Sequence, residues 1–202
     1  MSMQKNAIPA RPLLRPAIGL AVATMLVFGL GYSLAATGIA AVAFPAQAQG
    51  SLIERDGVIV GSSLVAQPFA DARYFAARPS AADYDPMALA GSNQARTNPE
   101  LRATIAGNVE AVAAREGIAA SEVPGDLVTR SGGGIDPHVS PDGARVQIAR
   151  VADARGLDGA RVQALVNAHT QGKTFGLLGA TRVNVLELNL ALDALSAERG
   201  AQ

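Results

Sequence analysis

The sequence contains no cysteine and no tryptophan, and only two of its 202 residues are histidine. The lack of cysteine excludes a disulfide scaffold, a cysteine nucleophile and a thiolate metal site. No Gly-x-Ser-x-Gly elbow, His-Glu-x-x-His pair or acidic calcium loop occurs. Basic and acidic side chains number 17 each, so there is no basic excess for nucleic-acid binding. We therefore expect no catalytic residues, no metal site, no directly bound cofactor and no nucleic-acid partner.

Charged side chains are also missing from one long segment. Between Arg15 and Glu54 no residue is charged, and residues 17–44 are mostly apolar. As an α-helix this stretch would extend about 42 Å, against about 30 Å for the hydrocarbon core of a bilayer. The basic residues ahead of it predict a cytoplasmic N-terminus: Lys5, Arg11 and Arg15. We expect three parts: a short cytoplasmic segment at 1–15, a transmembrane helix at 16–44 and an extracytoplasmic domain at 45–202.

A cleaved signal peptide is the alternative interpretation of the same segment. Ala46-Gln47-Ala48 matches the small-residue pattern at which signal peptides are cleaved. The apolar core of a signal peptide usually spans about 7 to 15 residues, however, which is shorter than this stretch. We favour an uncleaved anchor. The alternative predicts a secreted soluble binding protein or enzyme, released after Ala48, whose first residue is Gln49.

Small residues recur at every fourth position of the expected membrane helix, at Gly29, Ser33, Thr37 and Ala41. A strip of small side chains lets a second helix approach closely in lipid, where dispersion contacts and hydrogen bonds drive association. The strip therefore predicts packing against another membrane helix. The alternative is that these residue types are simply common in membrane helices.

The remainder of the chain has the signals of a small α+β domain. "GVIVGSSLVAQPF" is rich in Val and Ile between turn formers, which predicts one or two short strands. Helix starts are indicated at Asn98-Pro99-Glu100, Ser140-Pro141-Asp142 and Asp158. Residues 183–195 alternate as in a strand, but Asn184 followed by Glu187 resembles a capping box and favours a helix.

Two polar segments are candidates for binding chemistry. Gly172-Lys173-Thr174 matches the end of a phosphate-binding P-loop, but Asn167 stands where the motif needs glycine. We interpret Gly172 as a helix C-cap instead. In "SGGGIDPHVSP", Asp136 could orient the imidazole of His138, although one histidine and one aspartate make neither a metal site nor a triad.

Longer blocks carry a resemblance to a known family. They include "GSSLVAQPF", "YFAARPSA", "TNPEL", "VPGDLVTRSGGGIDPHVSP", "HTQGKTFGLLG" and "RVNVLELNLAL". In these blocks, and over nearly its full length, the chain resembles the C subunit of the Kdp high-affinity potassium-transporting P-type ATPases. One membrane helix and one external domain agree with that family.

The resemblance implies a non-catalytic accessory subunit of the bacterial inner membrane, with its C-terminal domain in the periplasm. Its implied partners are a potassium-channel-like subunit, an ATP-hydrolysing P-type subunit and a small fourth membrane subunit. ATP and potassium are then handled by the complex, and this subunit acts as a catalytic chaperone that raises the affinity of the pump subunit for ATP. Because ATP is cytoplasmic, we expect that effect to pass through the membrane helices as a coupling free energy.

The resemblance also indicates motif residues that order the domain or face a partner. They are Arg78, Ser92, Asn93, Asn98, Asp136, His138, His169, Arg182 and Asn184. The sequence departs from the family pattern at Gln94-Ala95-Arg96, where a Leu-Gly-Pro-like stretch is expected, and at Ser33, where proline is usual. We expect the second departure to leave the membrane helix straighter.

Overall fold

The structure is a computed structural model that describes the backbone of residues 13–200 and the side chains of residues 13–197. The basic residues Lys5 and Arg11 lie outside the described residues. The chain divides between Ser51 and Leu52 into two compact units. The second unit is a small α+β domain with two small sheets, and the predicted fold class is confirmed.

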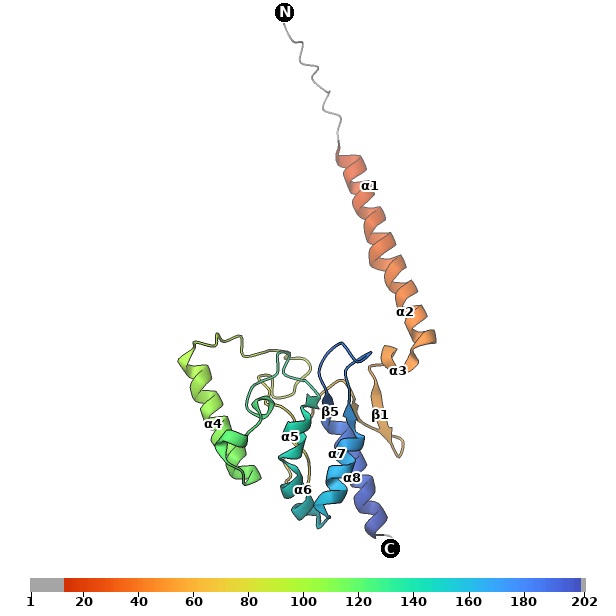
Figure 1. The fold of residues 1–202 in the computed structure, drawn as a ribbon. Helices are drawn as coiled ribbons and strands as arrows, with labels where there is room; N and C mark the ends of the chain where they lie inside the picture. Colours follow the sequence, from red (N-terminus) through yellow and green to blue (C-terminus); the bar gives the residue numbers. More distant parts are fainter. Residues whose placement is uncertain (1–12, 201–202) are drawn as a thin grey trace, which may run out of the picture. The chain divides into compact units, whose positions relative to one another are not determined.

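The first unit is dominated by one continuous apolar helix. Three segments follow one another without a break: α1 (Leu14–Thr24), the π-helical segment η1 (Met25–Gly31) and α2 (Tyr32–Ala43) (Figure 1). Together they form the one helix of the described residues that is long and apolar enough to cross a membrane. Phe44 ends it with φ −139° and ψ 61°, and Pro45 opens the short helix α3 (Pro45–Ala48). None of the residues in α1, η1 and α2 is buried.

The small-residue strip begins in the π-helical segment. Gly29 lies in η1, and Ser33, Thr37 and Ala41 lie in α2. The backbone N–H of Tyr32 donates to the carbonyl of Val27, five residues earlier. A π turn therefore replaces ordinary α turns just where the strip starts, and such turns are frequent at functional sites.

The first sheet of the second unit is a hairpin of β1 (Leu52–Arg55) and β2 (Val58–Ser62). Its two-residue turn has positive φ at both positions, 53° at Asp56 and 78° at Gly57. This is the combination that a type I′ hairpin turn requires, and Asp-Gly is among its preferred sequences. A short strand within residues 57–69 was predicted and is confirmed as β2, whereas β1 precedes that segment.

The second sheet is made from segments far apart in the chain. Its antiparallel strands are β3 (His138–Val139), β4 (Thr170–Gln171) and β5 (Arg182–Asn184), in the order β3-β5-β4. The predicted C-terminal helix is α8 (Val185–Gly200), which follows β5 directly. The side chain of Asn184 accepts a hydrogen bond from the Glu187 N–H at 3.2 Å, as half of the predicted capping box requires.

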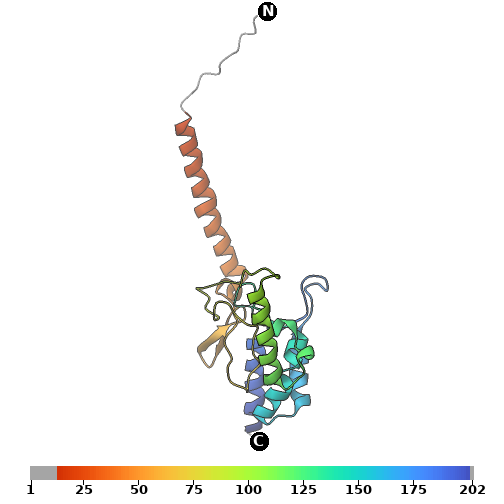
Figure 2. The same ribbon diagram turned by 90° about the vertical axis from the view of Figure 1, so that its left-hand side faces the viewer.

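The remaining helices begin where the sequence predicts them. Asn98 caps α4 (Pro99–Glu116), Ser140 caps α5 (Pro141–Arg145) and Asp158 caps α7 (Gly159–Ala168), each with a side-chain oxygen that accepts a backbone N–H. The helical segment that begins after Ser140 is divided, because two turn residues separate α5 from α6 (Ile148–Arg155). Two short 3₁₀ turns lie between α4 and β3: η2 (Ala120–Glu122) and η3 (Gly125–Leu127). Figure 2 shows α4 and the C-terminal helices of this unit from a second direction.

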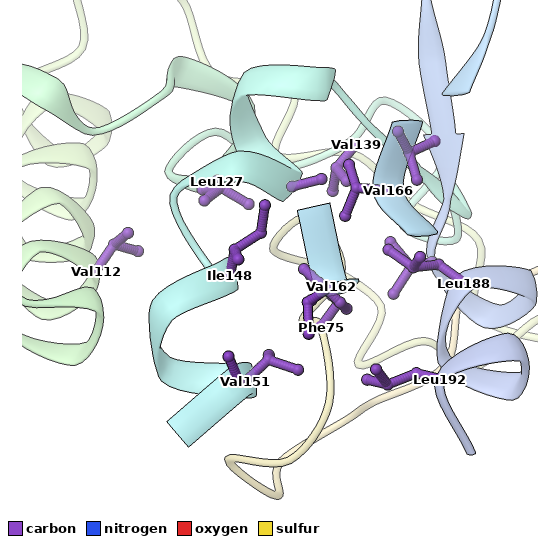
Figure 3. Packing of buried hydrophobic residues seen from close by; sticks show 14 of the residues in the cluster. Phe75, Val112, Leu127, Val139, Ile148, Val151, Val162, Val166, Leu188 and Leu192 are labelled. Carbon is purple, nitrogen blue, oxygen red and sulfur yellow. The ribbon is translucent and has the colours of Figure 1, made fainter. Parts of the chain in front are cut away.

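The core of the second unit gathers around Phe75, whose side chain is fully buried (Figure 3). Leu188 and Leu192 of α8 are one helical turn apart, and both are fully buried in the same cluster. The other buried members come chiefly from α6, α7, β3 and β5: Val139, Ile148, Val151, Ala152, Val162, Val166 and Val183. The side chains on the inner faces of these elements therefore share one apolar centre.

Phe75 belongs to an extended segment whose backbone is held by side chains rather than by a sheet. Asn189 of α8 accepts the N–H of Phe75 at 2.8 Å and donates to its carbonyl at 2.9 Å. Gln147 likewise accepts the N–H of Ala76 at 2.8 Å and donates to its carbonyl at 3.2 Å. Arg150 adds donors to the carbonyls of Ala72 and Tyr74. These side chains supply the hydrogen-bond partners that a neighbouring strand would otherwise give to the buried backbone groups.

We expect Asn189→Leu to lower the free energy of unfolding by about 2 to 6 kcal/mol. The substitution leaves the N–H and the carbonyl of Phe75 buried without partners, and each such group costs about 1 to 3 kcal/mol. Urea unfolding of the full-length protein in detergent, followed by circular dichroism, measures the loss. The matched control is Asn167→Leu on the exposed face of α7, which should change stability by less than about 0.5 kcal/mol. Equal effects of the two substitutions would contradict this account.

Candidate functional site

The structure brings five of the nine predicted residues together beside the second sheet. His138 begins β3, and Asn184 lies directly opposite it at the end of β5. Arg182 begins β5, and Asp136 lies two residues before β3. Arg78 reaches this place from the extended segment that carries Phe75. Residues up to 106 positions apart in the sequence therefore meet at one edge of the domain.

Asp136 links the three residues that we call the Arg78 cluster: Arg78, Asp136 and His138. One carboxylate oxygen accepts from the Arg78 guanidinium at 3.0 Å. The other accepts the backbone N–H of His138 at 3.0 Å and lies 3.4 Å from its Nδ1. The hydrogen bond of His138, more than the guanidinium of Arg78, holds the pKa of Asp136 below its usual value although burial opposes this. The carboxylate is thus kept ionised and fixed.

A shallow depression of about 360 Å³ lies over the Arg78 cluster. The three cluster residues line one side of it, and the chain from Gly179 to Arg182 lines another. Asp126 lies there too, and it accepts from both the N–H and the hydroxyl of Ser140 at 2.6 and 3.1 Å. Asp126 is not among the residues predicted from the sequence, because the partner that defines its role is 14 residues away and no local motif marks it.

The chemistry of this site is that of ordered, mutually bonded polar groups. Asp136 is bonded to Arg78 and His138, and Asp126 is bonded to Ser140, so the carboxylates are already engaged. Within the described part of the chain, no group of three or more His, Cys, Asp or Glu side chains could hold a metal ion. The arrangement is suited to presenting a fixed pattern of charge and hydrogen bonds to another surface.

Asn184 has a structural place as well as a position facing His138. Its side chain is buried, and its amide donates to the carbonyl of Ser63 at 2.7 Å while its oxygen caps α8 through Glu187. It therefore ties the chain that follows β2 to the start of α8.

The glycine run of "SGGGIDPHVSP" allows a second loop to lie close to the site. A Cβ at Gly91 would be 2.6 Å from the carbonyl oxygen of Gly132, and Gly134 has φ 78°. The hydroxyl of Ser80 donates to the carbonyl of Gly134 at 2.6 Å. Any side chain at these two glycines would clash or strain the backbone, so the loop before α4 is held against the glycine run.

The other four predicted residues lie outside the Arg78 cluster and the depression. Asn98 caps α4, as its sequence position predicts. Ser92 and Asn93 precede it in the same loop, and Asn93 is exposed with φ 51°. The imidazole Nδ1 of His169 lies 3.0 Å from the carbonyl oxygen of Leu165 at the end of α7. Gln94 belongs to the stretch at which the sequence departs from the family pattern. Its side chain donates a hydrogen bond to Glu100 at 3.2 Å and thus contacts the first turn of α4.

The interpretation of Gly172 as a helix C-cap is wrong. Helix α7 ends at Ala168, and His169 is its C-cap. Thr170 donates its hydroxyl to the carbonyl of Val166 at 2.7 Å, so side chains satisfy the last carbonyls without a left-handed glycine. Gly172 instead opens the loop between β4 and β5. This strand–loop–strand setting also differs from the strand–loop–helix of a P-loop.

Comparison with known proteins finds a family model that spans most of the chain. The family model of KdpC, the c chain of the K⁺-transporting ATPases, matches residues 14–194. The chain belongs to the KdpC family. The match covers the membrane-type helix, the Arg78 cluster and most of α8.

Individual members of the family are similar along most of their length. The potassium-transporting ATPase KdpC subunit of Xanthomonas campestris pv. campestris (strain B100) is 61% identical over 179 residues, which cover 89% of this chain and 86% of the relative. The subunit of the same name from Xanthomonas oryzae pv. oryzae (strain MAFF 311018) is 61% identical over 190 residues, with 93% and 91% covered. That of Sorangium cellulosum (strain So ce56) is 51% identical over 183 residues, with 89% and 96% covered.

We expect Asp136→Asn to destabilise the protein near neutral pH but not in strong acid. Because the folded-state pKa of Asp136 lies below its ordinary value of 3.8, its stabilising contribution is present above that pH and is lost as the pH falls through the folded pKa. The variant should therefore be less stable than the wild type by about 0.5 to 2 kcal/mol at pH 7, and the difference should vanish once the pH is below the folded-state pKa.

Urea unfolding of the full-length protein across this pH range measures the difference. Asp142→Asn is the control, because Asp142 forms an ion pair with Arg145 in which both side chains are mostly exposed, and exposed pairs contribute little. A difference between wild type and Asp136→Asn that stayed constant from pH 7 to pH 2 would contradict the role assigned to the ionised carboxylate.

Proposed function

We propose that this chain is a non-catalytic accessory subunit of an ATP-driven, high-affinity potassium uptake complex in the bacterial inner membrane. The observation that carries the proposal is the 30-residue apolar helix, none of which is buried within the chain, on a chain that matches the KdpC family from residue 14 to 194. A helix of this composition is stable where lipid or other membrane helices surround it.

The proposed partners are a potassium-channel-like subunit, the P-type subunit that hydrolyses ATP and a small fourth membrane subunit. Support comes from the relatives, which are named as subunits of potassium-transporting ATPases. The strip at Gly29, Ser33, Thr37 and Ala41 is the proposed contact with a partner helix, because small side chains permit close approach.

The proposed role is to assemble and stabilise the complex and to raise the ATP affinity of the hydrolysing subunit. The domain after Ser51 would lie on the periplasmic side, across the membrane from cytoplasmic ATP. An effect on ATP binding would then travel through packed membrane helices as a coupling free energy between two sites. The polar groups of the Arg78 cluster fit a docking and ordering role at the outer end of that path.

Co-purification from native membranes tests the proposal. Full-length protein with a C-terminal tag, solubilised in mild detergent, should be recovered with an intact N-terminus together with a P-type ATPase and a channel-like subunit, both identified by mass spectrometry. Ser33→Leu should reduce the recovery of these partners at least about tenfold, because a large side chain blocks close helix approach.

Ala35→Leu is the matched control, because it lies about 200° around the helix from Ser33 and should leave the recovery unchanged. A lone soluble chain that begins at Gln49 would instead establish the secreted alternative. Equal losses with both substitutions would contradict the proposed contact strip.

Membrane orientation gives a separate prediction. Since the sequence has no cysteine, a single introduced thiol is a clean reporter. Lys173→Cys, at an exposed position, should react with a membrane-impermeant maleimide in intact cells, whereas Ser2→Cys should react only after the cells are lysed. The reverse labelling pattern would place the domain in the cytoplasm, where it could contact ATP directly.

A further inference from the structure

The loop between β4 and β5 presents three large apolar side chains to solvent. Phe175 is 88% exposed, Leu177 is 81% exposed and Leu178 is 63% exposed, and we call these three residues the hairpin tip. Both ribbon views show this loop projecting from the body of the second unit (Figures 1 and 2). Thr174 exchanges two backbone hydrogen bonds with Leu178, at 2.9 and 3.0 Å, so the tip has a defined shape.

The backbone at the tip carries strain that the fold does not need. Phe175 has φ 54° and Gly176 has φ 73°, as in a type I′ turn. Asparagine, aspartate or glycine is preferred at the first of these positions, because a bulky side chain is unfavourable in the left-handed region. The sequence thus places a phenylalanine where it strains the turn and buries nothing within the chain. An outlier of this kind points to function.

The other phenylalanines of the second unit are used differently. Phe75 is fully buried, and Phe69 is partly buried against the same core. Phe175 is therefore the one phenylalanine of this unit whose side chain is mostly exposed. Aromatic side chains that fill pockets in a partner supply much of the binding energy of interfaces.

The charged side chains of the loop that carries the tip are all basic. From His169 to Leu186 the sequence contains no carboxylate, and its cations are Lys173 and Arg182. The arm from Gly179 to Arg182 also lines the depression over the Arg78 cluster. A complementary partner surface would have an apolar pocket for the tip and carboxylates at the border of that pocket.

A protein pocket explains the tip better than a lipid surface does. A bilayer accepts any apolar loop and does not require a particular turn, whereas a fixed and strained turn matters to a partner of complementary shape. We infer that the hairpin tip docks into an apolar pocket with an acidic border on the external face of an integral-membrane subunit of the transport complex. This inference rests on the proposed accessory-subunit function.

The substitution Phe175→Asn separates docking from folding. Asparagine suits the left-handed position, so the turn is kept and the melting temperature should stay the same or rise. The apparent affinity of the full-length chain for the complex of the remaining subunits, titrated in mild detergent, should fall at least about tenfold. The matched control is Met87→Asn, at a side chain that is 91% exposed outside the hairpin, which should leave the affinity unchanged.

A photo-reactive side chain at position 177 identifies the occupant in native membranes. A cross-link to an integral-membrane subunit of the complex supports the inference. Cross-links to lipid alone would assign the tip to the membrane surface and overturn it, as would an unchanged affinity of Phe175→Asn. If even the wild-type chain bound no other subunit, the proposed function itself would fail, so the two failures are distinguishable.

Discussion

The hydrogen bonds that Asn189 and Gln147 make to the backbone around Phe75 are the constraint on which the rest of the second unit depends. The two small sheets leave this segment unpaired, yet Phe75 is fully buried at the centre of the core. Buried peptide groups need partners. A primary amide side chain offers a donor and an acceptor on one plane, as a neighbouring strand does. Two such amides, on α8 and just before α6, therefore hold an extended segment in a core made mostly of helices.

The same constraint positions the candidate site. Arg78 follows Phe75 by three residues, so the amides that fix Phe75 also fix the point from which the guanidinium reaches Asp136. Helix α8, which carries Asn189, begins at the end of β5, and β5 pairs with both β3 and β4. The Arg78 cluster and the strands beneath the hairpin tip are thus attached to one packed core. Groups held in this way can present a fixed surface to a partner with little loss of conformational entropy.

Local signals in the sequence predicted much of this structure, and long-range contacts account for what they missed. The caps at Asn98, Ser140 and Asp158 are decided within three residues, and they are confirmed. The three-stranded sheet joins strands of two or three residues, which are too short to leave a periodic pattern. Likewise, the resemblance named Arg78 and Asp136, but only the fold shows that residues 58 positions apart are bonded. Gly172 is a local exception: α7 ends at Ala168, and the hydroxyl of Thr170 bonds to the carbonyl of Val166 only four residues earlier, so no glycine cap is used.

Two features of the chain leave large apolar side chains mostly exposed: the apolar helix and the strained hairpin tip. In the complex that we propose, both would become contacts, one inside the membrane and one outside it. Because one chain carries both contacts, formation of the first holds the second binding site close to its partner at a high effective concentration. Two individually weak contacts can therefore produce a stable assembly. Linkage then imposes a condition on the proposed chaperone role. If binding of this subunit tightens ATP binding by the pump subunit, ATP must tighten binding of this subunit by the same factor, because the coupling free energy belongs to both sites.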